Sequence, residues 1–177
     1  MKNTTKTKDD RPTFVYNGKP VRAAGLLISV KENGKTYYLL RGERKKHHTR
    51  WSDIGGKTDP GDNDIISTIV RETTEETNNH LFNSYDSYDK AYELLDLIIR
   101  NEELQIFYSP SAKYILIKME LDQSIKKLPM KRFGLKEKTD GWTMNHYYSW
   151  VNNVQRHKLH PRLRFHKEYT KIFNDTI

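Results

Sequence analysis

The chain has 177 residues, the usual size of one domain and enough to bury a hydrophobic core. The absence of cysteine excludes disulfide staples, thiolate zinc sites and a cysteine nucleophile. The net charge of +8 suits either a solvated lysine-rich surface or a phosphate-bearing partner. No apolar run approaches the roughly 20 residues that span a bilayer, and residues 1–11 lack the apolar core of a secretory signal. We therefore expect a cytoplasmic protein without a membrane partner.

The first third of the chain predicts an arm followed by a β-hairpin. We expect residues 1–13 to form a flexible basic arm and residues 14–177 to form one domain, because no linker or internal repeat divides the chain. The apolar run over residues 21–30 predicts a buried strand, and the Asn33-Gly34 signal after it predicts a tight hairpin turn. Residues 41–50 are basic and aperiodic, so we expect a loop there.

The rest of the chain predicts both helices and strands. Apolar residues recur at helical spacing in four segments: 64–78, 88–100, 144–151 and the stretch after Pro161. Residues 104–109 and 113–121 predict strands. The predicted fold class is therefore α/β, in a single domain.

The predicted helix over 64–78 carries the residues best suited to chemistry. A turn of roughly 100° per residue places Glu72, Glu75 and Glu76 in one arc of this helix, beside an apolar stripe. Three acids at this spacing repel one another, and a hard divalent cation such as Mg²⁺ would offset the repulsion. Gly55 and Gly56, which precede the helix, allow close approach of the backbone, so a carbonyl there is a candidate metal ligand. A solvated acidic face is the alternative explanation of the three acids alone.

This stretch resembles the Nudix box, the signature of the Nudix pyrophosphohydrolases. Gly56 matches the first Gly of that motif, Arg71-Glu72 matches its Arg-Glu pair and Glu75-Glu76 matches its Glu-Glu pair. Asp62 stands where the family has its first Glu. The residue types and their spacing together make the resemblance specific.

The match departs from the family pattern at four positions. Asp62 replaces the first Glu, and eight residues separate it from Arg71 where the family has seven, which leaves the role of Asp62 open. Thr73 occupies a position that is usually apolar, and Asn78 replaces the closing Gly. The Asn78 exchange is mild because Asn is the best non-Gly residue for a left-handed helix terminus.

The resemblance implies a Nudix-type α/β/α sandwich with a mixed sheet, followed here by C-terminal helices. It also implies hydrolysis of a nucleoside diphosphate linked to another group, with Mg²⁺ or Mn²⁺ as the cofactor. It assigns the metal to Glu72, Glu75, Glu76 and the carbonyl of Gly56, and it adds Arg71 to the catalytic residues.

Other candidate residues lie around the motif. An acid outside the box often serves as the general base in this family, and Glu137 is our candidate for that role. Basic and aromatic residues are candidates for contacts with substrate phosphates and bases: Lys45, Lys46, Arg50, Trp51, Lys57, Lys131 and Arg132. Solvated charge is the alternative for the basic residues, and core packing is the alternative for the aromatic one.

Three further segments resemble the divergent Nudix proteins of large DNA viruses, a group that includes mRNA-decapping enzymes. These segments are residues 131–137, the aromatic stretch ending at residues 148–150, and Leu-His-Pro-Arg-Leu at residues 159–163. With the positive charge, they favour capped RNA as the substrate, in the host cytoplasm if the protein is viral. The alternatives are a small nucleotide (ADP-ribose, a dinucleoside polyphosphate or an oxidised nucleotide) and a non-catalytic nucleotide- or RNA-binding module. The sequence leaves the oligomeric state open.

Overall fold

The centre of the fold is a hairpin of two long strands, β3 (Ala23–Glu32) and β4 (Lys35–Arg44). The structure is a computed structural model, and it describes residues 9–81, 87–128, 130, 133 and 146–173. Asn33 and Gly34 connect the two strands with φ angles of 51° and 73°. These left-handed values are those that a tight primed turn requires. The hairpin predicted from Asn33-Gly34 is confirmed.

Seven strands form one mixed sheet in the order β5-β4-β3-β8-β7, with β6 also beside β3 and β9 also beside β4. The other strands of the sheet are β5 (Thr49–Ser52), β6 (Ile54–Lys57), β7 (Gln105–Ser109), β8 (Tyr114–Leu121) and β9 (His146–Val151). Strands β3 and β8 are parallel, and the other pairs are antiparallel. Along one edge of β3, β6 pairs with its first half and β4 with its second half.

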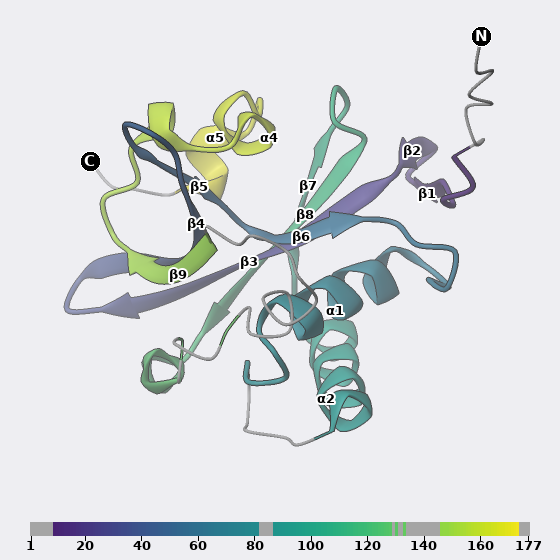
Figure 1. The fold of residues 1–177 in the computed structure, drawn as a ribbon, viewed down its shortest axis with the longest axis horizontal. Helices are drawn as coiled ribbons and strands as arrows, with labels where there is room; N and C mark the ends of the chain where they lie inside the picture. Colours follow the sequence, from purple (N-terminus) through teal and green to yellow (C-terminus); the bar gives the residue numbers. More distant parts are fainter. Residues whose placement is uncertain (1–8, 82–86, 129, 131–132, 134–145, 174–177) are drawn as a thin grey trace, which may run out of the picture.

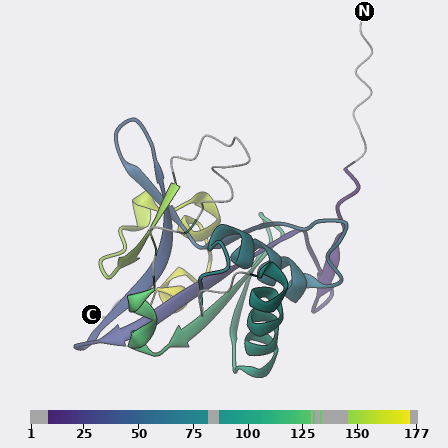
Figure 2. The same ribbon diagram turned by 60° about the horizontal axis from the view of Figure 1, so that its bottom comes forward.

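Helices cover both faces of this sheet (Figure 1). One face holds α1 (Ile65–Glu76) and α2 (Tyr88–Asn101), and the other holds the short helices α4 (Pro161–Arg164) and α5 (Tyr169–Ile172). The turned view in Figure 2 shows the same separation. Alternate residues of β3 serve the two cores, since Leu26 packs with α1 and Leu27 packs with the C-terminal helices. The predicted α/β fold with a mixed sheet and C-terminal helices is confirmed.

Local signals fix both ends of α1. Asp64 caps its first turn and forms a reciprocal capping box with Ser67, in which the Ser67 amide donates to Asp64 Oδ1 at 2.8 Å. After the helix, Asn78 and Asn79 take left-handed φ angles of 50° and 65°. The prediction that Asn78 replaces the closing Gly in this conformation is confirmed.

The described part of the N-terminal arm is attached to the domain. Arg22 Nη2 donates to the carbonyl of Arg11 at 3.1 Å, and the Thr58 hydroxyl donates to the carbonyl of Pro12 at 2.7 Å. A second Asn-Gly turn then joins β1 (Phe14–Tyr16) to β2 (Lys19–Val21). Arg11 and Pro12 thus contact the domain, and the flexible arm predicted for residues 1–13 stays a prediction.

Two predicted elements were wrong. Residues 146–151 form strand β9 instead of the helix predicted over 144–151, because the aromatic residues there alternate between the sheet faces: Tyr148 packs toward α1 and Tyr147 contacts Trp51 on the other side. Residues 41–50 are largely two paired strands instead of a loop, since β4 continues to Arg44 and β5 begins at Thr49. Charged side chains concealed these strands, because residues 43–50 show no alternation of apolar and polar residues.

Candidate active site

The candidate active site lies where α1 packs against β6. Gly55 and Gly56 belong to β6 and pair with Gly25 and Ala24 of β3. The carboxylate of Glu72 lies directly beside Gly56, so that a Cβ atom at that position would be 2.5 Å from the Glu72 carboxyl carbon. Glycine at position 56 is therefore what admits the Glu72 carboxylate to the strand.

Arg71 connects the acidic residues of the site. Its Nη1 donates to Glu72 Oε1 at 2.9 Å and lies 3.5 Å from Glu75 Oε2. Its Nε donates to Asp62 Oδ1 at 2.8 Å, and its Nη2 donates to the Lys57 carbonyl at 2.8 Å. One guanidinium group thus ties α1 to the loop before it and to the end of β6.

The role of Asp62, which the sequence left open, is to anchor Arg71. Asp62 also accepts a hydrogen bond from the Thr68 hydroxyl at 2.8 Å and one from the Asp59 amide at 2.9 Å. Although burial alone would raise the pKa of Asp62, its hydrogen bonds from Arg71 and Thr68 lower it. Asp62 therefore stays ionised and paired with Arg71.

Glu72 has the opposite electrostatic character. Burial raises the pKa of its carboxyl group, and this effect outweighs the neighbouring charge of Arg71. A buried carboxylate with a raised pKa gains from a further positive charge, such as that of a bound cation.

Glu76 lies beneath α1 and not on its exposed side. The residue is 4% exposed, and its carboxylate forms an ion pair with Arg41 of β4. The charge of Glu76 raises the pKa of Arg41, although burial of the guanidinium group by itself would lower that pKa. We missed Arg41 in the sequence, where its only signal was a lone arginine ending an apolar run.

The donor set of the site fits a hard divalent cation. Carboxylate and carbonyl oxygens are the ligands that Mg²⁺ prefers, and Glu72 and Glu75 converge on the same guanidinium nitrogen of Arg71. Within the described residues, no three His, Asp or Glu side chains are already grouped to hold a metal. Each of the three candidate carboxylates instead contacts an arginine.

Most candidate substrate-binding residues do not contact the acidic helix. Trp51 packs edge-on against Tyr147, at 5.4 Å between ring centroids, on the face opposite α1. Lys45 and Arg50 both pair with Glu43, and Lys46 is exposed in the β4–β5 turn. The exposed side chain of Lys57 ends β6 beside the site. Three further candidates lie outside the described residues: Lys131, Arg132 and Glu137.

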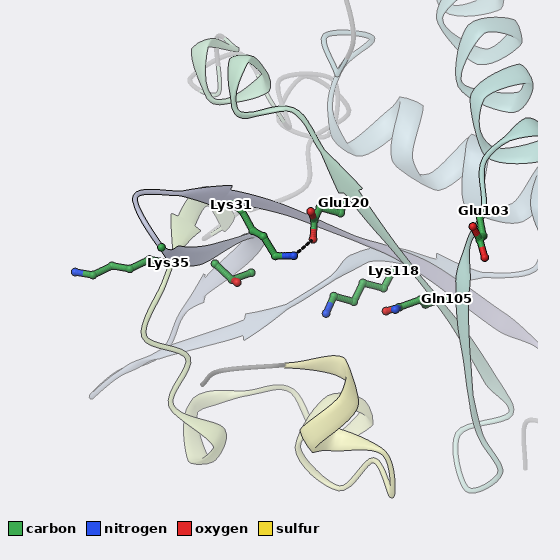
Figure 3. Close-up of a pocket in the computed structure, with 8 residues that line it drawn as sticks. Lys31, Lys35, Glu103, Gln105, Lys118 and Glu120 are labelled. Carbon is green, nitrogen blue, oxygen red and sulfur yellow. Dashed lines mark ion pairs between the residues drawn. The ribbon is translucent and has the colours of Figure 1, made fainter. Parts of the chain in front are cut away.

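A cavity of about 520 Å³ lies elsewhere, near the end of the β3–β4 hairpin (Figure 3). The residues lining it come from that hairpin, from β8 and from the start of β7, and they include Lys31, Lys118 and Glu120. Lys31 pairs with Glu120 at 3.2 Å, and Lys118 points into the cavity. Because its lining includes no residue of α1 or β6, this cavity is separate from the acidic site.

The site thus consists of an acidic helix, held by Arg71, that packs against the glycine pair of β6 in an α/β/α sandwich. The sequence profile of the NUDIX domain matches residues 19–138, more than half of the chain. The chain belongs to the Nudix family and is a Nudix hydrolase. Within the described residues, no helix is long and apolar enough to cross a membrane.

Two solved structures similar to this chain are of an Ap4A hydrolase from C. elegans. One is a binary complex, with 21% identity over 87% of this chain and 86% of that chain and a TM-score of 0.41. The other has 22% identity over the same shares and a TM-score of 0.36. At this level of similarity, neither structure bears on the substrate of this chain. No curated protein matches its sequence.

Proposed function

We propose that this Nudix hydrolase cleaves a pyrophosphate bond in a small nucleotide, using Mg²⁺ or Mn²⁺. The substrate class is a nucleoside diphosphate linked to a second group, as in dinucleoside polyphosphates, ADP-ribose or oxidised nucleotides. The observation that carries this proposal is the convergence of Glu72 and Glu75 on Arg71, beside the backbone of Gly56. Glu76, paired with Arg41, completes the acidic set.

In this proposal some residues of the site bind the cation, and others hold those residues in position. Glu72, Glu75, Glu76 and the Gly56 carbonyl would hold the cation. When bound, the cation supplies charge neutralisation of the pyrophosphate oxygens and a water of lowered pKa. Arg71 orients Glu72 and Glu75, and Lys57 extends from the end of β6 as a phosphate contact. Such pre-positioned charges stabilise the transition state without reorganising during the reaction.

The ion pairs of the described basic residues support a small substrate over capped RNA. A long RNA would need a track of lysines and arginines available to its phosphates. Several described basic residues of the segments 44–50, 126–127 and 156–171 are instead paired within the protein: Lys45 and Arg50 with Glu43, Lys126 with Glu32, Arg162 with Asp53 and Lys171 with Glu168. Each such pair neutralises a charge that RNA binding would use.

Capped RNA is the second candidate, because the net charge of +8 and exposed Lys46 favour a nucleic-acid partner. The cytoplasmic location expected from the sequence is compatible with both candidate functions.

A substrate panel tests both candidates. The protein is incubated with Mn²⁺ or Mg²⁺ and with diadenosine tetraphosphate, ADP-ribose, an oxidised nucleoside triphosphate, free cap analogue and a capped RNA, and the products are identified by mass spectrometry. We expect metal-dependent cleavage of at least one small nucleotide with a kcat/KM above that for capped RNA. Excess chelator should abolish the activity, and Glu75→Gln is the inactive control.

A salt series supplies the second measurement. Binding of single-stranded RNA should weaken with a logarithmic slope of about 0.7 per phosphate contact, whereas a small nucleotide should respond much less. Preferential, salt-sensitive cleavage of capped RNA would replace the small-nucleotide proposal with the RNA one. Full activity in excess chelator would contradict both.

A further inference from the structure

The C-terminal segment, residues 146–173, lies outside the part of the chain that matches the NUDIX profile. Its first residues form β9 within the sheet, and the residues after β9 pack on the sheet face opposite α1. The His160 amide donates to the Trp51 carbonyl at 2.7 Å, and Leu159 forms a parallel bridge with Trp51. Leu159 and Leu163 are fully buried in the core on that face. The segment therefore attaches to the chain just before β6.

Arg162 brings a buried charge from this segment to Asp53, the residue between β5 and β6. Its Nε donates to Asp53 Oδ1 at 2.9 Å, and its Nη2 donates to the Asp53 carbonyl at 3.3 Å. Tyr114 of β8 donates to the other carboxylate oxygen of Asp53, and the guanidinium lies 4.6 Å from the Tyr114 ring centroid. Asp53 is wholly buried. Its side chain and its backbone are thus both fixed.

Two glycines make room for this cluster. Gly25 and Gly55 face each other across β3 and β6. A Cβ atom on Gly25 would lie closer than 3.0 Å to both the Tyr114 hydroxyl and the Asp53 carboxylate, and one on Gly55 would lie 2.8 Å from the same hydroxyl. The adjacent Gly56 gives room to Glu72 on the other face. Residues 53–56 therefore connect the Arg162 cluster directly to the acidic site.

We infer that Arg162 is a positioning residue for the metal site, acting through Asp53 on β6, the strand in which Gly56 makes room for Glu72. The inference rests on the proposed metal-dependent function. A buried ion pair is on its own weak evidence for stability, and this pair joins a segment outside the family match to the strand of the site. Residues supporting metal ligands from behind typically change metal affinity or activity by about 10–100-fold when altered.

Arg162→Lys is the test variant, because lysine keeps the charge but not the two-pronged contact with Asp53. Arg164→Lys is the matched control: it makes the same exchange on the same helix, where the guanidinium lies 5.0 Å from the Phe165 ring centroid. We expect Arg162→Lys to weaken Mn²⁺ binding, measured by electron paramagnetic resonance, about tenfold or more. We expect kcat to fall similarly, with the nucleotide KM within about twofold of wild type. The control should match wild type.

A second variant keeps the test open if Arg162→Lys does not fold. Asp53→Asn keeps an acceptor for Tyr114 but weakens the hold of Arg162, and it should shift Mn²⁺ affinity and kcat in the same direction. If the variants keep wild-type Mn²⁺ affinity and kcat per folded molecule, whatever their melting temperature, this inference is overturned and the proposed function is not. Failure of both variants to fold would also overturn it, by reducing the pair to a folding role. A wild-type protein without Mn²⁺ binding or hydrolysis would instead overturn the proposed function, and this inference with it.

Discussion

Gly55 and Gly56 are neighbours in β6, yet an added methyl group would meet different atoms at each. At Gly56 it would meet the carboxylate of Glu72, the far end of a flexible side chain, which can move at the expense of its hydrogen bond from Arg71. At Gly55 it would lie closer than 3.0 Å to the Ala24 carbonyl oxygen and the Gly25 Cα, both backbone atoms of the central strand. The same substitution should therefore damage the site at one position and the fold at the other.

The expected magnitudes follow from these contacts. Overpacking against atoms that cannot yield costs about 3 kcal/mol, the upper part of the usual range. At about 2–4 °C per kcal/mol for a domain of this size, Gly55→Ala should lower the melting temperature by roughly 6–12 °C. Gly56 is not among the glycines with positive φ, so alanine there brings no backbone strain. Gly56→Ala should stay within about 3 °C of wild type and lose about 10–100-fold in Mn²⁺ affinity or kcat through displaced Glu72.

Thermal unfolding, Mn²⁺ binding and nucleotide hydrolysis are measured side by side on the two variants. Each variant is the control for the other, because the chemical change is identical and the positions are adjacent. A fully active Gly56→Ala would show that the position of Glu72 beside the strand does not matter to the site. A Gly55→Ala variant that melts like wild type would show that β3 and β6 are not packed as described.

Two further outcomes follow from the charges. Glu75→Gln should remove most turnover without changing the melting temperature, since the Glu75 side chain is 37% exposed. Glu76→Gln should lower both turnover and the melting temperature, because it leaves Arg41 with a neutral partner. Equal melting temperatures of the two variants would contradict the burial of Glu76. Burial and the charge of Arg162 lower the pKa of His160 from 6.5 to about 4. Between these pH values the unfolded chain binds a proton that the folded chain does not. The melting temperature should therefore fall as the pH decreases through this window. His160→Asn keeps an acceptor for the Arg162 amide and should flatten a melting curve series from pH 8 to 4; an unchanged slope would assign the dependence to other groups.

Local signals made part of the fold predictable. The Asn33-Gly34 turn and the capped acidic helix depend on residues close together in the chain, and both are present. The spacing of Glu72, Glu75 and Glu76 was also readable, but their environments were not. Periodicity placed all three acids in one arc, whereas the sheet beneath α1 buries Glu76 against Arg41. Burial depends on the sheet partner, which helical spacing does not contain.

Long-range pairing accounts for what the sequence did not reveal. Aromatic residues near Tyr148 fit a helical period and a strand period alike, and pairing with β4 decides for the strand. Asp53 and Arg162 are 109 residues apart, and nothing in either local sequence indicates the other. The Asp53 carboxylate that Arg162 meets lies, with the Tyr114 hydroxyl, in the gap that Gly25 and Gly55 leave on the face of the sheet. Such a gap exists only after the sheet has assembled.

The extra residue between Asp62 and Arg71 shows how the motif tolerates variation. The position of β6 is set by its register with β3, and the start of α1 is set by the Asp64 cap, so the intervening loop is free to differ in length. That loop closes on itself, with the Gly61 amide donating to Asp59 at 3.0 Å. Asp62 still reaches Arg71 at 2.8 Å. Because the strand and the start of the helix are fixed independently of the loop, a length change confined to the residues before Asp64 leaves Glu72 beside Gly56, whereas one inside α1 would rotate Glu72 away from it.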